Sequence, residues 1–377
     1  MQESRFFPEI HGNFGFGCMR LPMRDGQVDY GQFQRMADAF VAAGFNYFDT
    51  AHGYINGLSE TAIRDCVSAR YDRSRFLLTN KLTEPYFDRQ EDIRPFLEQQ
   101  LALCGVDYFD FYLMHAQDHN NYPKFQRCRA YETAMQLKQE GLIRHLGISF
   151  HDTPEMLDRI LTDHPEVEIV QIQFNYVDYE DPHVQSRGVY EVCERHHKPV
   201  IVMEPVKGGN LVNLPPEADR VFRALKGGSN ASYAVRFAAS FPSMAMVLSG
   251  MSNMEQMEDN LSAMTDFRPL NEAEMAAVDE VRAVFSRLER IPCTACRYCI
   301  EESQCPKAIR IPDLFRVMND YQTYHNEHIK GYYRHGLTVD GHGRASECIR
   351  CGKCEQVCPQ HLPIRELLQS VAEALEG

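Results

Sequence analysis

"RFLLTNK", residues 75–81, is a short apolar run that is followed by the amphipathic stretch "QEDIRPFLEQQLALCG" (90–105) and the second apolar run "FDFYLMH" (109–115). The two short runs are apolar on both faces, which is typical of strands buried in a parallel sheet. The stretch between them has the length and periodicity of a helix. Together they predict a strand–helix–strand unit with parallel strands.

The same alternation extends over the first 288 residues. Eight short apolar runs lie at 13–17, 45–50, 75–81, 109–115, 144–150, 168–175, 200–204 and 245–250. Eight strands alternating with helices over about 280 residues predict an α/β fold, a (β/α)8 TIM barrel. A doubly wound sheet is the alternative, but it normally carries an early G-x-G-x-x-G, and this chain has only Gly15-Phe16-Gly17 there.

Two helix starts are predicted from local signals. Thr153-Pro154-Glu155 places a proline at a first helical position. Asn271, with Glu274 three residues later, is a plausible N-cap for a helix over 271–287.

Polar residues end most of the apolar runs. In a barrel all the carboxyl ends of the strands open on one face, where the chemistry takes place. A single polar strand end often only meets solvent, but a succession of them favours a functional face. These residues are Asp49, Lys81, His115, Ser149, Gln173, Asn175 and Glu204.

Three of the strand-end stretches resemble a known family. "FDTAHGYINGLSE" (48–60), "TNK" (79–81) and "LMH" (113–115) resemble the aldo-keto reductase family, and the resemblance covers roughly residues 12–285. It implies a (β/α)8 barrel that reduces carbonyls, or oxidises alcohols, with a nicotinamide cofactor. Carried over position by position, its catalytic residues would be Asp49, Tyr54, Lys81 and His115.

The chemistry of these side chains suits that reaction. A carbonyl needs a hydride on carbon and a proton on the developing alkoxide. A phenol, with a reference pKa of ~10, is a proton donor at neutral pH, and a nearby ammonium stabilises the phenolate. Tyr54 is therefore expected to be the general acid, with Lys81 beside it. Asp49 would hold Lys81, and His115 would orient the substrate oxygen. Alone, Tyr54 would pass for an ordinary loop tyrosine.

The resemblance also implies a dinucleotide site. Ser149, His151 and Gln171 would hold the nicotinamide carboxamide, with His151 where the family usually has Asn; Met203 stands where an aromatic ring often stacks. "EPVKGG" (204–209) would form the phosphate side, through Glu204, Lys207, Gly208 and Gly209. The adenosine part would contact Ser252, Gln256, Asp259 and Asn260. Because Gln256 replaces a common Arg, NADP and NAD both stay open, with NADP favoured.

The tail is rich in cysteine. Of 13 cysteines, eight form two runs: Cys293-x2-Cys296-x2-Cys299-x5-Cys305-Pro306 and Cys348-x2-Cys351-x2-Cys354-x3-Cys358-Pro359. The second run is the bacterial ferredoxin signature for [4Fe–4S] clusters, in which the fourth cysteine ligates the other cluster. One predicted cluster is held by Cys293, Cys296, Cys299 and Cys358. The other is held by Cys348, Cys351, Cys354 and Cys305, the last after an unusual x5 spacing.

Zinc and disulfides are the competing interpretations of these runs. Structural zinc sites favour paired C-x2–4-C motifs, and disulfides are rare in a reducing cytosol. We therefore expect two domains, a barrel over 1–288 and a small, mostly helical, ferredoxin-like domain over 289–377.

Bulk composition narrows the partners and the location. The net charge of −14 argues against nucleic acid or an anionic membrane as the main partner. No apolar run approaches the ~20 residues that span a bilayer. "MQESRFFPEIHG" at the N-terminus has no apolar signal-peptide region, so a cytoplasmic protein is expected.

Three functions follow as hypotheses. The first is an NAD(P)H-dependent oxidoreductase of the EC 1.1.1 type acting on a small carbonyl or alcohol substrate. The second is an electron-transfer protein that exchanges single electrons with a ferredoxin or flavoprotein partner. The third is a barrel that senses nicotinamide redox state. Coupling hydride transfer to one-electron clusters needs an intermediary such as a flavin, and the sequence has no flavin signature.

Overall fold

The structure is a computed structural model that describes residues 5–377 except 183, 289, 325–326 and 340. Its chain forms two compact units, Met1–Val206 with Gly227–Met275 and Lys207–Lys226 with Ala276–Gly377. This packing boundary at Met275 lies ahead of the 288/289 boundary suggested by the cysteine pattern, because α11 (Glu272–Phe285) runs from the first unit into the second. The functional division at residue 288 stays a prediction.

The first unit contains a closed barrel of eight parallel strands, in the order β1-β10-β9-β8-β7-β6-β5-β4. The strands are β1 Phe14–Gly17, β4 Tyr47–Asp49, β5 Leu77–Leu82, β6 Phe109–Gln117, β7 Ile143–Phe150, β8 Ile169–Gln173, β9 Val200–Met203 and β10 Met244–Gly250. Each lies within or overlaps one predicted apolar run. The predicted (β/α)8 fold is therefore confirmed. The doubly wound sheet is excluded. A short antiparallel hairpin, β2 (Met23–Arg24) with β3 (Gln27–Val28), lies outside the barrel sheet.

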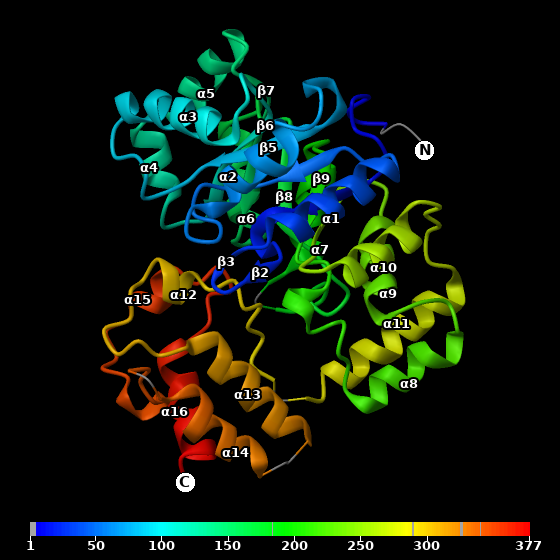
Figure 1. Ribbon diagram of the computed structural model, residues 1–377, viewed down its shortest axis with the longest axis vertical. Helices are drawn as coiled ribbons and strands as arrows, with labels where there is room; N and C mark the ends of the chain where they lie inside the picture. The colour runs from blue at the N-terminus through cyan, green and yellow to red at the C-terminus, as the bar shows by residue number, and fades with distance from the viewer. Residues whose placement is uncertain (1–4, 183, 289, 325–326, 340) are drawn as a thin grey trace. The chain divides into compact units, whose positions relative to one another are not determined.

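Helices surround the strands of this unit (Figure 1). They are α1 Tyr30–Ala42, α2 Leu58–Ile63, α3 Gln90–Cys104, α4 Tyr122–Arg127, α5 Ala130–Gln139, α6 Pro154–Asp163, α7 Ser186–Arg195, α9 Asn230–Ala239 and α10 Met254–Met264. Thr153 caps α6 by accepting a hydrogen bond from the Met156 amide. Asn271 and Glu274 accept each other's backbone amide protons at the start of α11, at 3.0 and 2.9 Å, so both predicted helix starts are confirmed.

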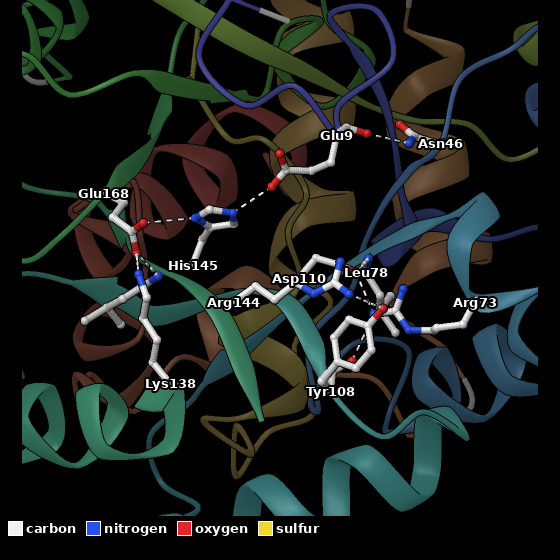
Figure 2. Close-up of polar contacts among 11 residues, drawn as sticks. Glu9, Asn46, Arg73, Leu78, Tyr108, Asp110, Lys138, Arg144, His145 and Glu168 are labelled. Atoms are coloured by element: carbon white, nitrogen blue, oxygen red, sulfur yellow. Dashed lines mark hydrogen bonds and ion pairs between the residues drawn. The ribbon is translucent and has the colours of Figure 1, made fainter. Parts of the chain in front are cut away.

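The amino ends of the strands are closed by the N-terminal segment and by two polar groups, the first partly buried and the second buried. Phe7 and Ile10 pack into a core cluster with Leu113 and other inward-facing strand residues. Figure 2 shows His145 between Glu9 and Glu168, with Nε2 2.6 Å from Glu9 Oε1 and Nδ1 2.9 Å from Glu168 Oε2.

The second polar group at this end surrounds Asp110. Its carboxylate is fully buried and accepts hydrogen bonds from Arg73 at 2.6 Å, the Leu78 amide at 2.8 Å and Arg144 at 3.1 Å (Figure 2). A buried carboxylate is tolerated only when it is paired in this way. The end of the barrel opposite the predicted site is therefore tied together by ion pairs.

The second unit is mainly helical. Its helices are α8 Pro216–Leu225, α12 Tyr298–Glu301, α13 Ile311–Tyr324, α14 His328–Tyr332, α15 Lys353–Gln356 and α16 Ile364–Leu375. α13 and α16 pack against each other (Figure 1), and Leu314, Phe315, Leu368 and Val371 lie in the shared core. Within the described part of the chain, no helix has the length and apolar character needed to cross a membrane.

Candidate active site and cysteine cavities

An ion pair between neighbouring strands forms the base of the candidate site. Lys81 Nζ, on β5, donates to Asp49 Oδ1 on β4 at 2.7 Å and to the carbonyl of Thr50 at 2.8 Å. Lys81 is fully buried and Asp49 nearly so. Burial lowers the pKa of Lys81 while Asp49 opposes the shift; burial raises the pKa of Asp49 while Lys81 opposes it. Each group is therefore the main counter-charge of the other.

Tyr54 lies next to this pair. Lys81 Nζ is 4.8 Å from the centre of the Tyr54 ring, and the rings of Tyr54 and His115 are 6.1 Å apart in an edge-on arrangement. The backbone after Tyr54 is left-handed at Ile55, Asn56 and Gly57, with φ of 54°, 53° and 84°. A β-branched residue in this conformation is an outlier, and such strain concentrates at functional sites. The four residues predicted to act together thus lie together.

A buried carboxylate that the sequence analysis did not assign supports the Tyr54 loop. Glu60 is fully buried. Its Oε1 accepts from Asn80 Nδ2 at 2.8 Å, and its Oε2 lies 2.6 Å from His52 Nδ1. These contacts connect the loop to β5. Glu60 closes the quoted 48–60 stretch, but nothing in its local pattern indicates a buried acceptor.

His115 is held by another unassigned residue. Thr83 Oγ1 is 2.8 Å from Nδ1 of His115. Burial lowers the pKa of His115 well below its usual range, and Lys81 and His151 lower it further. Either Thr83 Oγ1 or His115 Nδ1 can be the donor in this contact, and Thr83 Oγ1 also lies 3.4 Å from the Lys81 carbonyl oxygen. When Thr83 donates to Nδ1, the single N–H of the neutral imidazole is on Nε2. The pairing of Leu82 with Met114 places Thr83 beside His115, so the strand register was the signal that could have found it.

The residues expected at the nicotinamide lie on adjacent strands. Ser149 and Gln171 are paired in register between β7 and β8, and both are buried. Gln171 Nε2 donates to Asp49 Oδ2 at 3.4 Å, whereas its buried Oε1 has no hydrogen-bond partner among the described residues. An amide N–H₂ would satisfy that oxygen. The His151 amide donates to the Gln117 carbonyl at 3.0 Å.

The residues expected at the adenosine surround the start of α10. The Ser252 amide donates to Gln256 Oε1 at 2.7 Å, and Asn253, which was not assigned, caps the helix. Asp259 accepts from Ser229 at 2.7 Å. Asn260 donates to the Gln256 carbonyl at 2.7 Å, while its buried Oδ1 has no partner among the described residues. This oxygen is a second buried acceptor that suits a ligand amino group.

The stretch after β9 is divided between the two units. Glu204, in the first unit, accepts from Arg20 at 3.3 Å, and its carbonyl accepts from Asn175 at 3.0 Å. Lys207, Gly208 and Gly209 belong to the second unit. All three are left-handed, with φ of 48°, 63° and 98°.

Within the second unit, this loop packs against the first cysteine segment. A Cβ on Gly208 would lie 2.1 Å from the carbonyl oxygen of Thr294. Asn210 Nδ2 donates to the carbonyls of Lys207 at 2.9 Å and of Cys293 at 3.1 Å. Gly208 is therefore required both by its conformation and by the close approach of Thr294. No pattern in the sequence indicates this contact.

The eight tail cysteines line two separate cavities. The first has Cys293, Cys296, Cys299 and Cys358 in its walls. The second has Cys305, Cys348, Cys351 and Cys354. These are the two sets expected from the crossed ferredoxin pattern, and Ile311 lines both cavities. No three His, Cys, Asp or Glu side chains of the described residues converge to hold a single metal ion.

The two cysteine runs also share a backbone pattern. Left-handed residues occur at equivalent places, namely Ala295 and Arg350, Arg297 and Gly352, and Ala308 and His361. The Ala295 amide lies 3.4 Å from the sulfur of Cys293, and the Arg350 amide lies 3.4 Å from the sulfur of Cys348. Ala308 follows Cys305 by three residues, and His361 follows Cys358 by three residues. The two runs therefore match again from their fourth cysteine onward, and the longer x5 spacing affects only the segment between Cys299 and Cys305.

Comparison with known proteins gives two family matches. The model described as the aldo/keto reductase family matches residues 13–283, and that of a 4Fe-4S dicluster domain matches residues 292–362. The uncharacterized oxidoreductase YqkF of Bacillus subtilis is 25% identical over 300 residues, which cover 70% of this chain and 90% of that protein. L-galactose dehydrogenase of Arabidopsis thaliana is 25% identical over 305 residues, with 74% and 91% covered.

A solved structure has the same fold. The aldo/keto reductase from Klebsiella pneumoniae in complex with NADP and acetate has a TM-score of 0.60 and 22% identity, covering 72% of this chain and 91% of that one. An aldo-keto reductase from Bacillus halodurans has a TM-score of 0.59, 22% identity and coverage of 74% and 95%.

Proposed function

Because the chain belongs to the aldo/keto reductase family and carries a 4Fe-4S dicluster domain, we propose that it reduces an aldehyde or ketone, or oxidises the corresponding alcohol, with NADP(H) or NAD(H). The observation that carries this proposal is the buried Lys81–Asp49 pair beside the Tyr54 ring. The barrel and its strand ends are a general scaffold, whereas this pair has a specific use in moving a proton.

The proposed mechanism assigns one task to each side chain. The dinucleotide, when bound, supplies the hydride. Tyr54 donates its hydroxyl proton to the carbonyl oxygen, and the Lys81 ammonium stabilises the resulting phenolate. Asp49 keeps Lys81 charged and in place. His115 is neutral because burial lowers its pKa, and in the tautomer whose Nδ1 accepts from Thr83 it would present Nε2–H to the substrate oxygen.

The residues available for the dinucleotide fit its polar groups. Gln171 Oε1 and Asn260 Oδ1 are buried acceptors suited to the carboxamide and the adenine amino group. Ser149 and His151 would complete the nicotinamide side. The phosphate side would be formed by Glu204, Lys207, Gly208 and Gly209. The adenosine side would be completed by Ser252, Gln256 and Asp259. Gln256 carries no charge to pair with a 2′-phosphate, so equilibrium binding of NADPH and NADH is the measurement that decides the preference.

We further propose that the tail holds two [4Fe–4S] clusters. Thiolates in two sets of four suit this cofactor, and each cluster would supply one electron at a time. An anaerobic preparation is expected to contain about eight irons and eight sulfides per chain. An electron-transfer protein that serves a ferredoxin or flavoprotein is the second candidate function, favoured by the presence of these two cavities.

Replacement of Tyr54 tests the reductase proposal. Tyr54→Phe removes the acid and keeps the ring, so we expect normal dinucleotide binding and iron content with turnover lower by ~10²–10⁴. Tyr332→Phe, at an exposed tyrosine of α14, is the matched control and should turn over normally. Near-normal turnover of Tyr54→Phe would refute the role of this phenol.

A further inference from the structure

The two cysteine cavities differ in the exposure of the residues that line them. Of the eight cysteines that line them, Cys351 is the exposed one, and it belongs to the second cavity. Ile349, also in that wall, is 55% exposed although it is a large apolar residue. The first cavity is walled by the buried side chains of Phe315, Leu362 and Ile364. Cys351 and Ile349 therefore give a protein partner direct contact with the wall of the second cavity.

Positive charges surround the exposed cavity. Lys307, Arg350 and Lys353 are exposed, and Lys307 and Lys353 line the cavity. None of the three forms an ion pair with any residue that the structure describes. A fourth cation, Arg365, is occupied by Glu355, with Nε and one terminal nitrogen 2.8 and 2.6 Å from Oε2. We call Lys307, Ile349, Arg350 and Lys353 the cationic rim.

The positive charge of this rim is opposite in sign to the net charge of the chain. The protein has 39 Lys and Arg against 53 Asp and Glu, with a net charge of −14. Compensation of the thiolate charge would be one reason for nearby cations. The first cavity also has four cysteines, yet its lining cation, Arg297, is paired with Glu301 at 3.1 Å. Since the same compensation is not repeated there, the unpaired rim calls for a different explanation.

We propose that the cationic rim docks an acidic, ferredoxin-type electron carrier, and that single electrons pass between the carrier and the cluster held by Cys305, Cys348, Cys351 and Cys354. In each event the reduced carrier loses one electron and this cluster gains it, or the reverse, and no bond or proton is transferred. Complementary charge steers such encounters, and an apolar residue inside a charged rim suits a short-lived interface. The inference rests on the proposed cluster assignment.

The experiment measures the rate at which the intact, cluster-loaded protein is reduced by a purified acidic bacterial ferredoxin under anaerobic conditions. The test variant is Lys307→Glu with Arg350→Glu and Lys353→Glu. The matched control is Arg220→Glu with Lys226→Glu and Arg316→Glu, which changes net charge equally at exposed cations that line neither cavity. Iron content, sulfide content and cluster potentials are measured for both. Reduced methyl viologen, a cation, serves as the second electron donor.

We expect the wild-type rate with ferredoxin to fall steeply with added salt. The rim variant should be slower by about tenfold or more at low salt and nearly insensitive to salt, whereas the control should resemble the wild type. The rim variant should accept electrons from methyl viologen at least as fast as the wild type. Equal ferredoxin rates in the two variants, or a rate explained by shifted cluster potentials, would overturn the docking proposal. Protein without iron and sulfide would overturn the cluster assignment itself.

Discussion

The ammonium of Lys81 has no access to solvent, and Asp49 is the carboxylate that balances it. Removing one partner of a buried pair leaves a charge that nothing compensates, which costs far more than the pair contributes. Burial already lowers the pKa of Lys81, and Asp49 limits that shift. In the proposed mechanism, Asp49 therefore acts on Tyr54 through the charge of Lys81.

Asp49→Asn is therefore expected to act on both stability and catalysis. Without the carboxylate, the pKa of Lys81 falls further, so its charge is lost at a lower pH and turnover declines from a lower pH than in the wild type. Unfolding free energy should fall by about 3–5 kcal/mol. Urea unfolding and a pH–rate profile measure the two effects.

The double variant Asp49→Asn with Lys81→Met is the control for charge. It should recover part of the lost stability, because no unpaired charge remains, but should stay inactive. Wild-type stability and an unchanged pH–rate profile in Asp49→Asn would contradict the coupling of Asp49 to Lys81.

At the scale of elements, the loop after β9 connects the expected phosphate site to the cysteine segment. Both belong to the second compact unit, and Gly208 and Asn210 contact Thr294 and Cys293 directly. A disturbance of this loop should therefore affect the cluster and the dinucleotide together.

Gly208→Ala tests that connection. The added methyl group would overlap the Thr294 carbonyl, so we expect lower iron and sulfide content and weaker dinucleotide binding. Gly209→Ala is the matched control, because Gly209 is also left-handed but a Cβ there meets nothing within 4 Å. It should bear only the backbone strain of ~1–3 kcal/mol and keep its iron. Full iron content and normal binding in Gly208→Ala would rule out the connection.

The N-terminal segment gives a second prediction at this scale. Burial opposes protonation of His145, but Glu168 and Glu9 raise its pKa above the usual range. A raised folded pKa stabilises the protein below the unfolded pKa of ~6.5, and this contribution is lost as pH rises through the folded value. Relative to His145→Gln, the wild type should thus gain more stability at about pH 6 than at about pH 9. A pH-independent difference for His145→Gln would contradict the prediction.

Most elements of the barrel were predictable because their signals are local. The eight apolar runs specify the strands, and Asn271 with Glu274 specifies the start of α11. The contacts that support the site are not local. Glu60 on α2 depends on Asn80 of β5, and Gly208 depends on the carbonyl of Thr294, far along the chain. Thr83 could have been predicted, because the register of β5 against β6 places it beside His115.

At the scale of the whole molecule, two kinds of redox chemistry are proposed for one chain. The proposed barrel reaction moves two electrons as a hydride, whereas each proposed cluster moves one. Ile311 lines both cysteine cavities, so the two clusters would be neighbours and could together hold as many electrons as one hydride delivers. The reductase proposal requires first that the barrel transfers hydride to carbon.

Transfer of deuterium from the nicotinamide C4 to a carbonyl carbon tests this requirement most directly. The intact protein is incubated without oxygen with C4-deuterated NADPH or NADH and a panel of aldehydes, ketones and sugars, and the products are examined by mass spectrometry. We predict an alcohol with one deuterium on its carbinol carbon from the wild type and almost none from Tyr54→Phe. The reductase proposal would be contradicted if the dinucleotide were oxidised with reduction of a ferredoxin or dye and no alcohol contained deuterium.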